Sequence, residues 1–209
     1  MLTFDQALSQ LLAAACAVSE TSSLPTLAAA GRVLAQAQRA PIDAPPLDNS
    51  AMDGYAVAVA DVRSVPARLP VVQRIPAGSV GTPLLPGTAA RIFTGAAIPA
   101  GADAVVMQEL CEHATGEVTI NHRPEAGEHI RRAGSDIAAG SEILAAGQRL
   151  RPQDTALAAS VGLAALPVFR RLRVAVFFTG DELRMPGEAL QAGAIYNANR
   201  FLLTGLLER

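Results

Sequence analysis

The chain has 209 residues, half of them hydrophobic, and a formal net charge of −2. This length allows one large domain or two small ones with a hydrophobic core, and the composition is not that of a disordered chain. All 17 basic residues are arginine, which excludes Schiff-base lysine chemistry and a Walker-type phosphate loop, because both need a lysine. The slightly acidic balance gives no reason to expect contact with nucleic acid.

Cysteine usage and hydropathy point to the cytoplasm. Cys16 and Cys111 lie far apart and have no second cysteine at metal-ligand spacing, so neither a zinc site nor a disulfide framework is predicted. The first five residues, MLTFD, lack the basic segment of a secretory signal. No uncharged apolar stretch approaches the ~20 residues of a membrane span. We therefore expect a cytoplasmic protein without membrane contact.

The first 46 residues are predicted to contain two helices. Apolar residues recur at helical spacing from Thr3 to Val18, and Thr3 or Asp5 can cap this helix. Residues 25–38 show a second helical pattern, weakened by Gly31. The prolines that follow exclude further helix.

Short apolar runs alternate with glycine and proline between residues 47 and 140, which is typical of strands joined by turns. The clearest runs are 55–57, 70–72, 104–107 and 117–120. Residues 141–150 continue the pattern. Residues 151–161 then indicate a helix, with Pro152 near its first turn.

The last 38 residues predict the beginning of an α/β domain. Residues 172–178 form a compact β pattern, a polar loop follows at 179–182, and Asn197 or Asn199 can cap a final helix. Strand, loop and helix in this order are the first unit of a domain with a parallel sheet. One such unit does not bury both faces of the sheet, so we expect a domain that is cut short.

The densest polar segment is LDNSAMDGYAV at residues 47–57. Two carboxylates, an amide and a hydroxyl fall close together there, on Asp48, Asn49, Ser50 and Asp53. The Asp-Gly step at Asp53 allows a tight backbone turn. The pattern fits an Asx-type turn into a strand as well as it fits a binding site.

A second segment, RIFTGAAIP at residues 91–99, places Thr94 and Gly95 after an apolar strand. A hydroxyl and a glycine amide can together contact an anion. The same pattern also fits a structural turn.

A third segment, GEHIRRAGSDI at residues 127–137, contains paired arginines. Arg131 and Arg132 suit phosphate or a carboxylate. Asp136 can instead pair with one of these arginines and leave no charge for a ligand. His129 has no partner at metal-ligand spacing and is interpreted as a surface or structural histidine.

A fourth segment, Thr179-Gly180-Asp181-Glu182, follows the predicted strand at 172–178. Open α/β sheets bind ligands just beyond the carboxyl ends of their strands. Hard carboxylate oxygens at such a place suit Mg²⁺ with a phosphorylated substrate. The alternative is a solvated acidic loop.

These segments agree in order and spacing with one known family. PLDNSAMDGYAV, RIFTGAAIPAGADAVVMQE, GEHIRRAGSDI, VAVFFTGDEL and IYNANR closely resemble the MoeA/gephyrin E-domain family of molybdopterin molybdenumtransferases. The resemblance runs from about Phe4 to the end of the chain.

The resemblance implies a role in inserting molybdenum into the pyranopterin dithiolate. In this family, adenylylated molybdopterin and molybdate are converted to molybdenum cofactor and AMP, with Mg²⁺ or a similar divalent metal. The partners it implies are a second copy of the chain, as a homodimer, together with a molybdopterin adenylyltransferase and proteins that mature molybdoenzymes.

The resemblance also implies an α+β multi-domain fold. A helical domain would comprise residues 1–46 and 141–171, with a β-rich domain inserted at 47–140. The truncated start of an α/β molybdopterin-binding domain would occupy 172–209. The family's cleft forms between the β-rich domain of one subunit and the α/β domain of the other.

The resemblance assigns roles to the polar segments. The residues that match polar active-site positions, and are expected to be catalytic, are Asp53, Thr94, Asp136 and Glu182. Substrate contacts are expected from Ser50, Gly95, Arg131, Arg132, Thr179 and Gly180. Asp181 or Glu182 would hold Mg²⁺ on the pyrophosphate, where the metal offsets charge on the leaving AMP.

Family chains are roughly twice as long as this one, so we expect an N-terminal portion with weak or no activity alone. Residues 202–207 would then expose an apolar face. The alternative is a non-catalytic family member that acts as a dimerisation or protein-interaction module. A third hypothesis, a generic Mg²⁺-dependent phosphate enzyme, has no independent motif in its favour.

Overall fold

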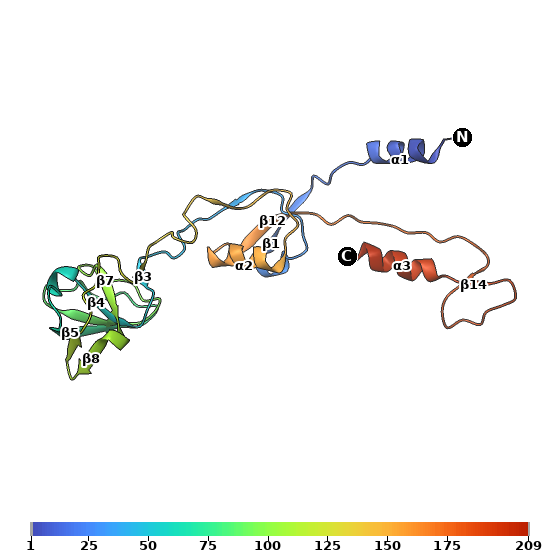
Figure 1. Ribbon diagram of the computed structural model, residues 1–209. Coiled ribbons are helices and arrows are strands. Elements are labelled where there is room, and N and C mark those ends of the chain that lie inside the picture. Colours follow the sequence, from blue (N-terminus) through green and yellow to red (C-terminus); the bar gives the residue numbers. More distant parts are fainter. Residues whose placement is uncertain (1, 209) are drawn as a thin grey trace. The chain divides into compact units, whose positions relative to one another are not determined.

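The computed structural model describes residues 2–208. It divides into two units, several of whose helices and strands are labelled in Figure 1. The central unit is Thr21–Phe169, and the terminal unit consists of the described residues on either side of it, 2–20 and 170–208. Helices and strands are mixed in both, so the predicted mixture of α and β structure is confirmed.

The main sheet of the central unit has six strands in the order β7-β4-β6-β5-β9-β8. Their bounds are β4 Gly54–Val57, β5 Ala67–Ile75, β6 Ala89–Ile92, β7 Ala104–Met107, β8 Cys111–Ala114 and β9 Glu117–Ile120. Strand β4 is antiparallel to both neighbours, whereas β5 and β6 are parallel. The predicted apolar runs at 55–57, 70–72, 104–107 and 117–120 all lie in these strands.

Each face of this sheet carries a hydrophobic core. A single strand contributes to both cores, because successive residues of a strand point to opposite sides. One face carries the core Tyr55, Val57, Val62, Leu69, Ala89, Ala104, Val106, Val118 and Ile120. The other carries Ala56, Ile75, Leu84, Ala90, Ile92, Ala96 and Val105. Strands β4 and β7 are therefore apolar along their length, whereas β5, β8 and β9 also contain exposed or polar residues.

A smaller core holds the ends of the central unit together. Strands β1 (Thr21–Pro25) and β12 (Ala165–Phe169) pair antiparallel, and helix α2 (Pro152–Ser160) lies near them (Figure 1). The buried residues are Ala29, Leu34, Leu144, Leu150, Ala158, Leu166 and Val168. Helix α2 confirms the helix predicted at 151–161.

Short paired segments link this core to the six-stranded sheet. Strand β2 (Gln38–Arg39) pairs with β11 (Glu142–Leu144), and β3 (Asn49–Ser50) pairs with β10 (Ile130–Arg131). Three single 3-10 turns complete the unit, η1 Thr26–Ala28, η2 Val59–Asp61 and η3 Gln108–Leu110.

The terminal unit contains two helices and one short ladder. Helix α1 (Phe4–Ala13) is capped by Thr3, whose hydroxyl accepts from the Gln6 amide at 3.3 Å. Helix α3 (Ala198–Leu207) is capped by Asn197, as expected. Strands β13 (Leu183–Arg184) and β14 (Ile195–Tyr196) pair parallel. Neither helix of this unit, nor any other in residues 2–208, has the length and hydropathy to cross a membrane.

The second helix predicted, at residues 25–38, is wrong. The segment instead holds the end of β1, the turn η1, single bridges at Val33 and Leu34, and the start of β2. The backbone is paired with distant segments instead: Leu34 N donates to Gln148 O at 2.9 Å, and Gly31 has a positive φ of 78°. Tertiary partners have overridden a modest local propensity. The first helix ends at Ala13, five residues before the predicted end.

The predicted strand at residues 172–178 is also absent from the described structure. A strand is stabilised by pairing with a neighbour, and no segment of the described chain pairs with this one. The domain limits at 46/47, 140/141 and 171/172 stay a prediction.

Candidate functional site

The carboxylate of Asp53 and the residue Thr94 meet at one point of the central unit. Both the amide and the hydroxyl of Thr94 donate to Asp53 Oδ1, at 2.8 and 2.7 Å. The other oxygen, Oδ2, has no hydrogen-bond partner within residues 2–208 and is free to contact a ligand. Two residues separated by 41 positions thus form one acceptor site.

The backbone around Asp53 is fixed from two sides. Its carbonyl accepts from the Gln108 amide at 3.0 Å, and the next carbonyl, that of Gly54, accepts from Arg91 Nη1 at 3.2 Å. Gly54 packs so closely on β7 that a Cβ atom there would lie 2.0 Å from Val106 O. The Asp-Gly step is therefore required for close approach of β4 and β7.

These contacts keep Asp53 ionised. The amide of Thr94 is the largest influence lowering the pKa of Asp53 below its ordinary value, followed by the Thr94 hydroxyl. The positive charge of Arg91 acts in the same direction. Hydrogen bonds to a carboxylate favour its charged form, so this group is a hydrogen-bond acceptor and its lowered pKa makes it a weaker proton acceptor than a free carboxylate.

The backbone of Ser50 connects its own segment, 47–57, with the segments 91–99 and 127–137. Its carbonyl accepts from the Gly95 amide at 2.8 Å, and its own amide donates to Ala96 O at 2.9 Å. On the other side it lies opposite Ile130 in the β3–β10 ladder. Gly95 has a positive φ of 81°, which a turn here requires. The Ser50 hydroxyl donates to Met52 O at 2.6 Å, so it stabilises the turn that leads to Asp53.

The arginines of the third segment pair with carboxylates. Arg131 binds Asp136 at 2.7 Å, and Arg132 binds Asp48 at 2.6 Å. The Ala133 amide and then Arg132 lower the pKa of Asp48. The pairing of Asp136 with one of these arginines is therefore present in the structure. These pairs are solvent-exposed, so a substrate anion can compete for the arginines at modest cost.

Thr179, Gly180, Asp181 and Glu182 lie in the terminal unit. Gly180 has a positive φ of 149°, and a Cβ atom there would lie 2.5 Å from Glu182 Oε2. The Glu182 carboxylate therefore folds back over the glycine. Thr179 lines a hollow of about 680 Å³ with parts of α3.

The carboxylates of Asp181 and Glu182 fit Mg²⁺ in their chemistry. Mg²⁺ is usually held by one or two carboxylates, with waters and substrate phosphates completing its shell. Both residues are exposed neighbours. Within residues 2–208 no cluster of three or more histidine, cysteine or acidic side chains gathers as a metal cage.

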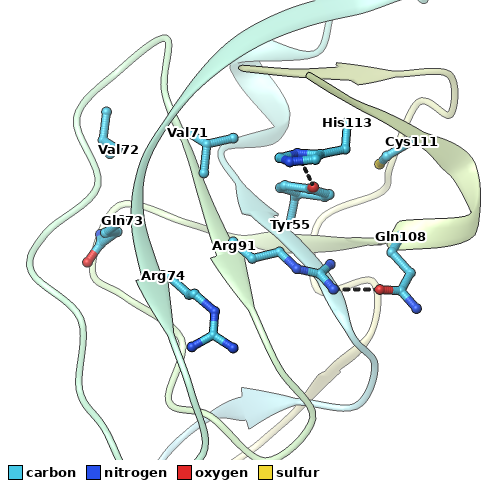
Figure 2. A pocket seen from close by; sticks show the side chains of 9 residues that line it. All are labelled: Tyr55, Val71, Val72, Gln73, Arg74, Arg91, Gln108, Cys111 and His113. Atoms are coloured by element: carbon cyan, nitrogen blue, oxygen red, sulfur yellow. Dashed lines mark hydrogen bonds between the residues drawn. The ribbon is translucent and has the colours of Figure 1, made fainter. Parts of the chain in front are cut away.

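The structure adds residues that sequence patterns did not single out. Arg91 lies with its guanidinium carbon 5.1 Å from the Tyr55 ring centre, and it donates to the side chain of Gln108 (Figure 2). The hydroxyl oxygen of Tyr55 lies 3.3 Å from His113 Nδ1. Strand register sets these contacts, so a local sequence pattern does not reveal them. The place of Arg91 within the RIFTGA segment is the one feature of the sequence that could have drawn attention to it.

Comparison with known proteins points to one family. The family described as "MoeA N-terminal region (domain I and II)" matches residues 2–162. Molybdopterin molybdenumtransferase 2 of Mycobacterium tuberculosis is 45% identical over 186 residues, covering 87% of this chain and 46% of the relative. Molybdopterin molybdenumtransferase of Haemophilus influenzae is 41% identical over 211 residues, covering all of this chain and 52% of the relative.

A solved structure agrees as well. The crystal structure of the molybdopterin biosynthesis moeA protein from Pyrococcus horikoshii OT3 has a TM-score of 0.88 and 33% identity, over all of this chain and 57% of that one. The chain spans about half the length of the curated relatives it matches. The family match and these identities together establish that the chain belongs to the MoeA family and carries its N-terminal region.

Proposed function

We propose that this chain supplies the N-terminal part of a molybdopterin molybdenumtransferase. In the reaction, adenylylated molybdopterin and molybdate are the substrates, and molybdenum cofactor and AMP are the products. The observation that carries the proposal is the Asp53–Thr94 pair, an ionised carboxylate with one oxygen fixed and the other free. The names of relatives at 41–45% identity support it.

The central unit would supply the acidic and hydroxyl part of the site. Asp53 Oδ2 would accept a hydrogen bond from a water or hydroxyl at the reacting phosphate, while Thr94 holds the carboxylate in place. Gly95 would offer backbone contact to an anion. Arg131 and Arg132 would exchange their exposed carboxylate partners, Asp136 and Asp48, for substrate phosphate.

The terminal unit would supply the metal ligands. Asp181 and Glu182 would hold Mg²⁺, and Thr179 and Gly180 would contact the substrate beside them. A bound Mg²⁺ neutralises charge on a pyrophosphate and so favours release of AMP.

The assembly proposed for this chain is a homodimer in the cytoplasm that meets a molybdopterin adenylyltransferase and molybdoenzyme-maturation proteins. Its support is the family resemblance, together with exposed apolar side chains on α1 and α3. These are Phe4, Leu8, Leu11 and Leu12 on α1, and Phe201, Leu202, Leu206 and Leu207 on α3. Sedimentation of the purified chain at several concentrations tests this assembly.

Complementation tests the activity. A strain that lacks its molybdenum insertase would receive the 209-residue chain, or a version continued with the second half of a relative. We expect the longer version to restore a molybdenum-dependent growth phenotype and the short chain to restore little or none. In the longer version, Asp53→Asn should abolish growth while the protein remains folded.

Asp61 provides a matched control. It is also a half-buried carboxylate of the central unit that accepts from a backbone amide, that of Gly87 at 2.7 Å, but it lies outside the polar segments. Asp61→Asn should leave growth intact. Normal growth with Asp53→Asn would contradict the proposed catalytic role and favour the non-catalytic interaction module instead.

A further inference from the structure

A hollow of about 660 Å³ lies on the six-stranded sheet of the central unit (Figure 2). Its walls come from four strands and the turn η3. The lining residues are Tyr55, Val71, Val72, Gln73, Arg74, Arg91, Gln108, Cys111 and His113. Two of these nine are arginines and none is acidic, so the hollow carries an excess of positive charge.

The two arginines face each other across neighbouring strands. Arg74 of β5 lies opposite Arg91 of β6 in the parallel ladder. Both guanidinium groups stack on the ring of Phe93, with their carbons 4.4 and 4.8 Å from its centre. Like charges directly opposite each other on a sheet are destabilising, and stacking on one ring keeps these two close together.

No carboxylate within residues 2–208 forms an ion pair with either arginine. Arg91 is partly used, since it donates to Gly54 O and to the Gln108 side chain. The guanidinium of Arg74, by contrast, stacks on Phe93 and makes no side-chain hydrogen bond among the described residues. Its planar fork of five donors is exposed at the rim of the hollow and without a hydrogen-bond acceptor there.

Further polar groups of the hollow are positioned to assist. The Tyr55 hydroxyl is held 3.3 Å from His113 Nδ1, which leaves the second ring nitrogen of His113 without a partner among the described residues. Gln73 is committed to Thr82, with a bond of 2.8 Å from Nε2 to Thr82 O. The hollow therefore offers hydrogen-bond donors that lack an acceptor among the described residues, and most of them belong to Arg74.

We propose that this hollow is a binding site for a tetrahedral oxyanion, a phosphoryl group or molybdate, with Arg74 as its principal ligand and Arg91 as the second charge. Arginine is suited to such anions because its fork donates two parallel hydrogen bonds. The site is separate from Asp53 Oδ2 and adjoins it through Gly54, whose carbonyl Arg91 holds. It stands on this geometry and does not require the proposed transferase activity.

Binding can be measured without turnover. The 209-residue chain, labelled with ¹⁵N, would be titrated with sodium molybdate, with inorganic phosphate and with AMP at low ionic strength, because salt screens exposed charges. We expect saturable shifts of the Arg74 and Arg91 Nε–H signals. Saturation by molybdate but not AMP would assign the site to molybdate, and the reverse to a phosphoryl group.

Substitutions distinguish a built site from general charge attraction. Arg74→Gln should weaken binding about tenfold, the loss of one charge-assisted contact, and Arg74→Lys should restore part of it. The matched control is Arg68→Gln, which removes an exposed arginine of the same strand outside the hollow and should leave affinity unchanged. Amide spectra of each variant show that it is folded.

Absence of saturable binding by all three anions in the folded chain would overturn the proposal. Equal weakening by Arg74→Gln and Arg68→Gln would also overturn it, because only net charge would then matter.

Discussion

The central and terminal units differ in how they treat their apolar residues. All three hydrophobic cores lie in Thr21–Phe169. In the terminal unit the apolar residues of α1 and α3 are exposed, with Phe4 80% and Leu11 72% accessible. Both units follow the same local rules for caps and turns, so the difference lies in long-range packing.

This difference teaches what positions the candidate site. Asp53 directly precedes β4 and Thr94 lies shortly after β6, and both strands contribute to the cores on the two faces of the sheet. The sheet therefore sets the distance between these two residues. Asp181 and Glu182 lie in a segment held by local turns and one short ladder.

Truncating a core side chain of the central unit should have the largest effect. Ile92 is fully buried, so Ile92→Ala should lower the free energy of unfolding by about 2–5 kcal/mol. The exposed Leu11 of α1 is the matched position in the terminal unit, and Leu11→Ala should change it by less than about 0.5 kcal/mol. Urea unfolding followed by circular dichroism measures both. Equal losses would mean that Leu11 is packed in solution.

Glycine substitutions should separate the units next. Gly54→Ala places a Cβ atom against the backbone of Val106 and should cost about 1–3 kcal/mol or more, as overpacking does. Gly193 in the terminal unit has open space around its Cα but a positive φ of 84°, so Gly193→Ala should cost only about 1 kcal/mol. A Gly54→Ala variant as stable as Gly193→Ala would contradict the close packing of β4 on β7.

The ion pair at the start of α2 should give the central unit a distinct pH dependence. Hydrogen bonds from the Arg151 side chain hold the pKa of Asp154 at about 2, below its ordinary value of 3.8. A carboxyl group with a lowered pKa stabilises the fold at pH values above its ordinary pKa. This stabilisation is lost as the pH falls towards 2. Asp154→Asn should therefore be less stable than the parent chain at pH 6, with the gap closing near pH 2. A gap independent of pH would be evidence against this pair.

The smallest effect concerns the charge of Asp53 itself. Thr94→Val removes the hydroxyl donor and keeps the amide donor, so the pKa of Asp53 should rise while staying below its ordinary value. Thr94→Ser, which retains the hydroxyl, serves as the control and should leave it unchanged. Carboxyl ¹³C shifts followed through a pH titration report this value. An unchanged pKa in Thr94→Val would show that the hydroxyl contact is absent in solution.

Local signals were read correctly from the sequence. Thr3 caps α1, Pro152 begins α2 and Asn197 caps α3, because each effect acts within one helical turn. Apolar runs likewise located four strands of the main sheet, β4, β5, β7 and β9. The failures, at 25–38 and 172–178, are segments whose state depends on which distant chain pairs with their backbone.

The site shows the same division. Residue types at 91–99 indicated an anion contact, and those at 47–57 a polar turn or a binding site. The hydrogen bonds between Asp53 and Thr94 span 41 positions, and only the family resemblance linked them. The pairing of Arg74 with Arg91 depends on strand register, which no local pattern encodes. What the sequence alone could not supply is therefore the set of contacts between strands.

Release of AMP from adenylylated molybdopterin in the presence of molybdate measures the catalytic role proposed for Asp53. The protein would be a full-length family member that carries residues 1–209 as its N-terminal part, compared with its Asp53→Asn and Asp61→Asn variants. The predicted result is a fall of at least about 100-fold for Asp53→Asn and none for Asp61→Asn. AMP release by folded Asp53→Asn at the rate of the parent protein would contradict the account.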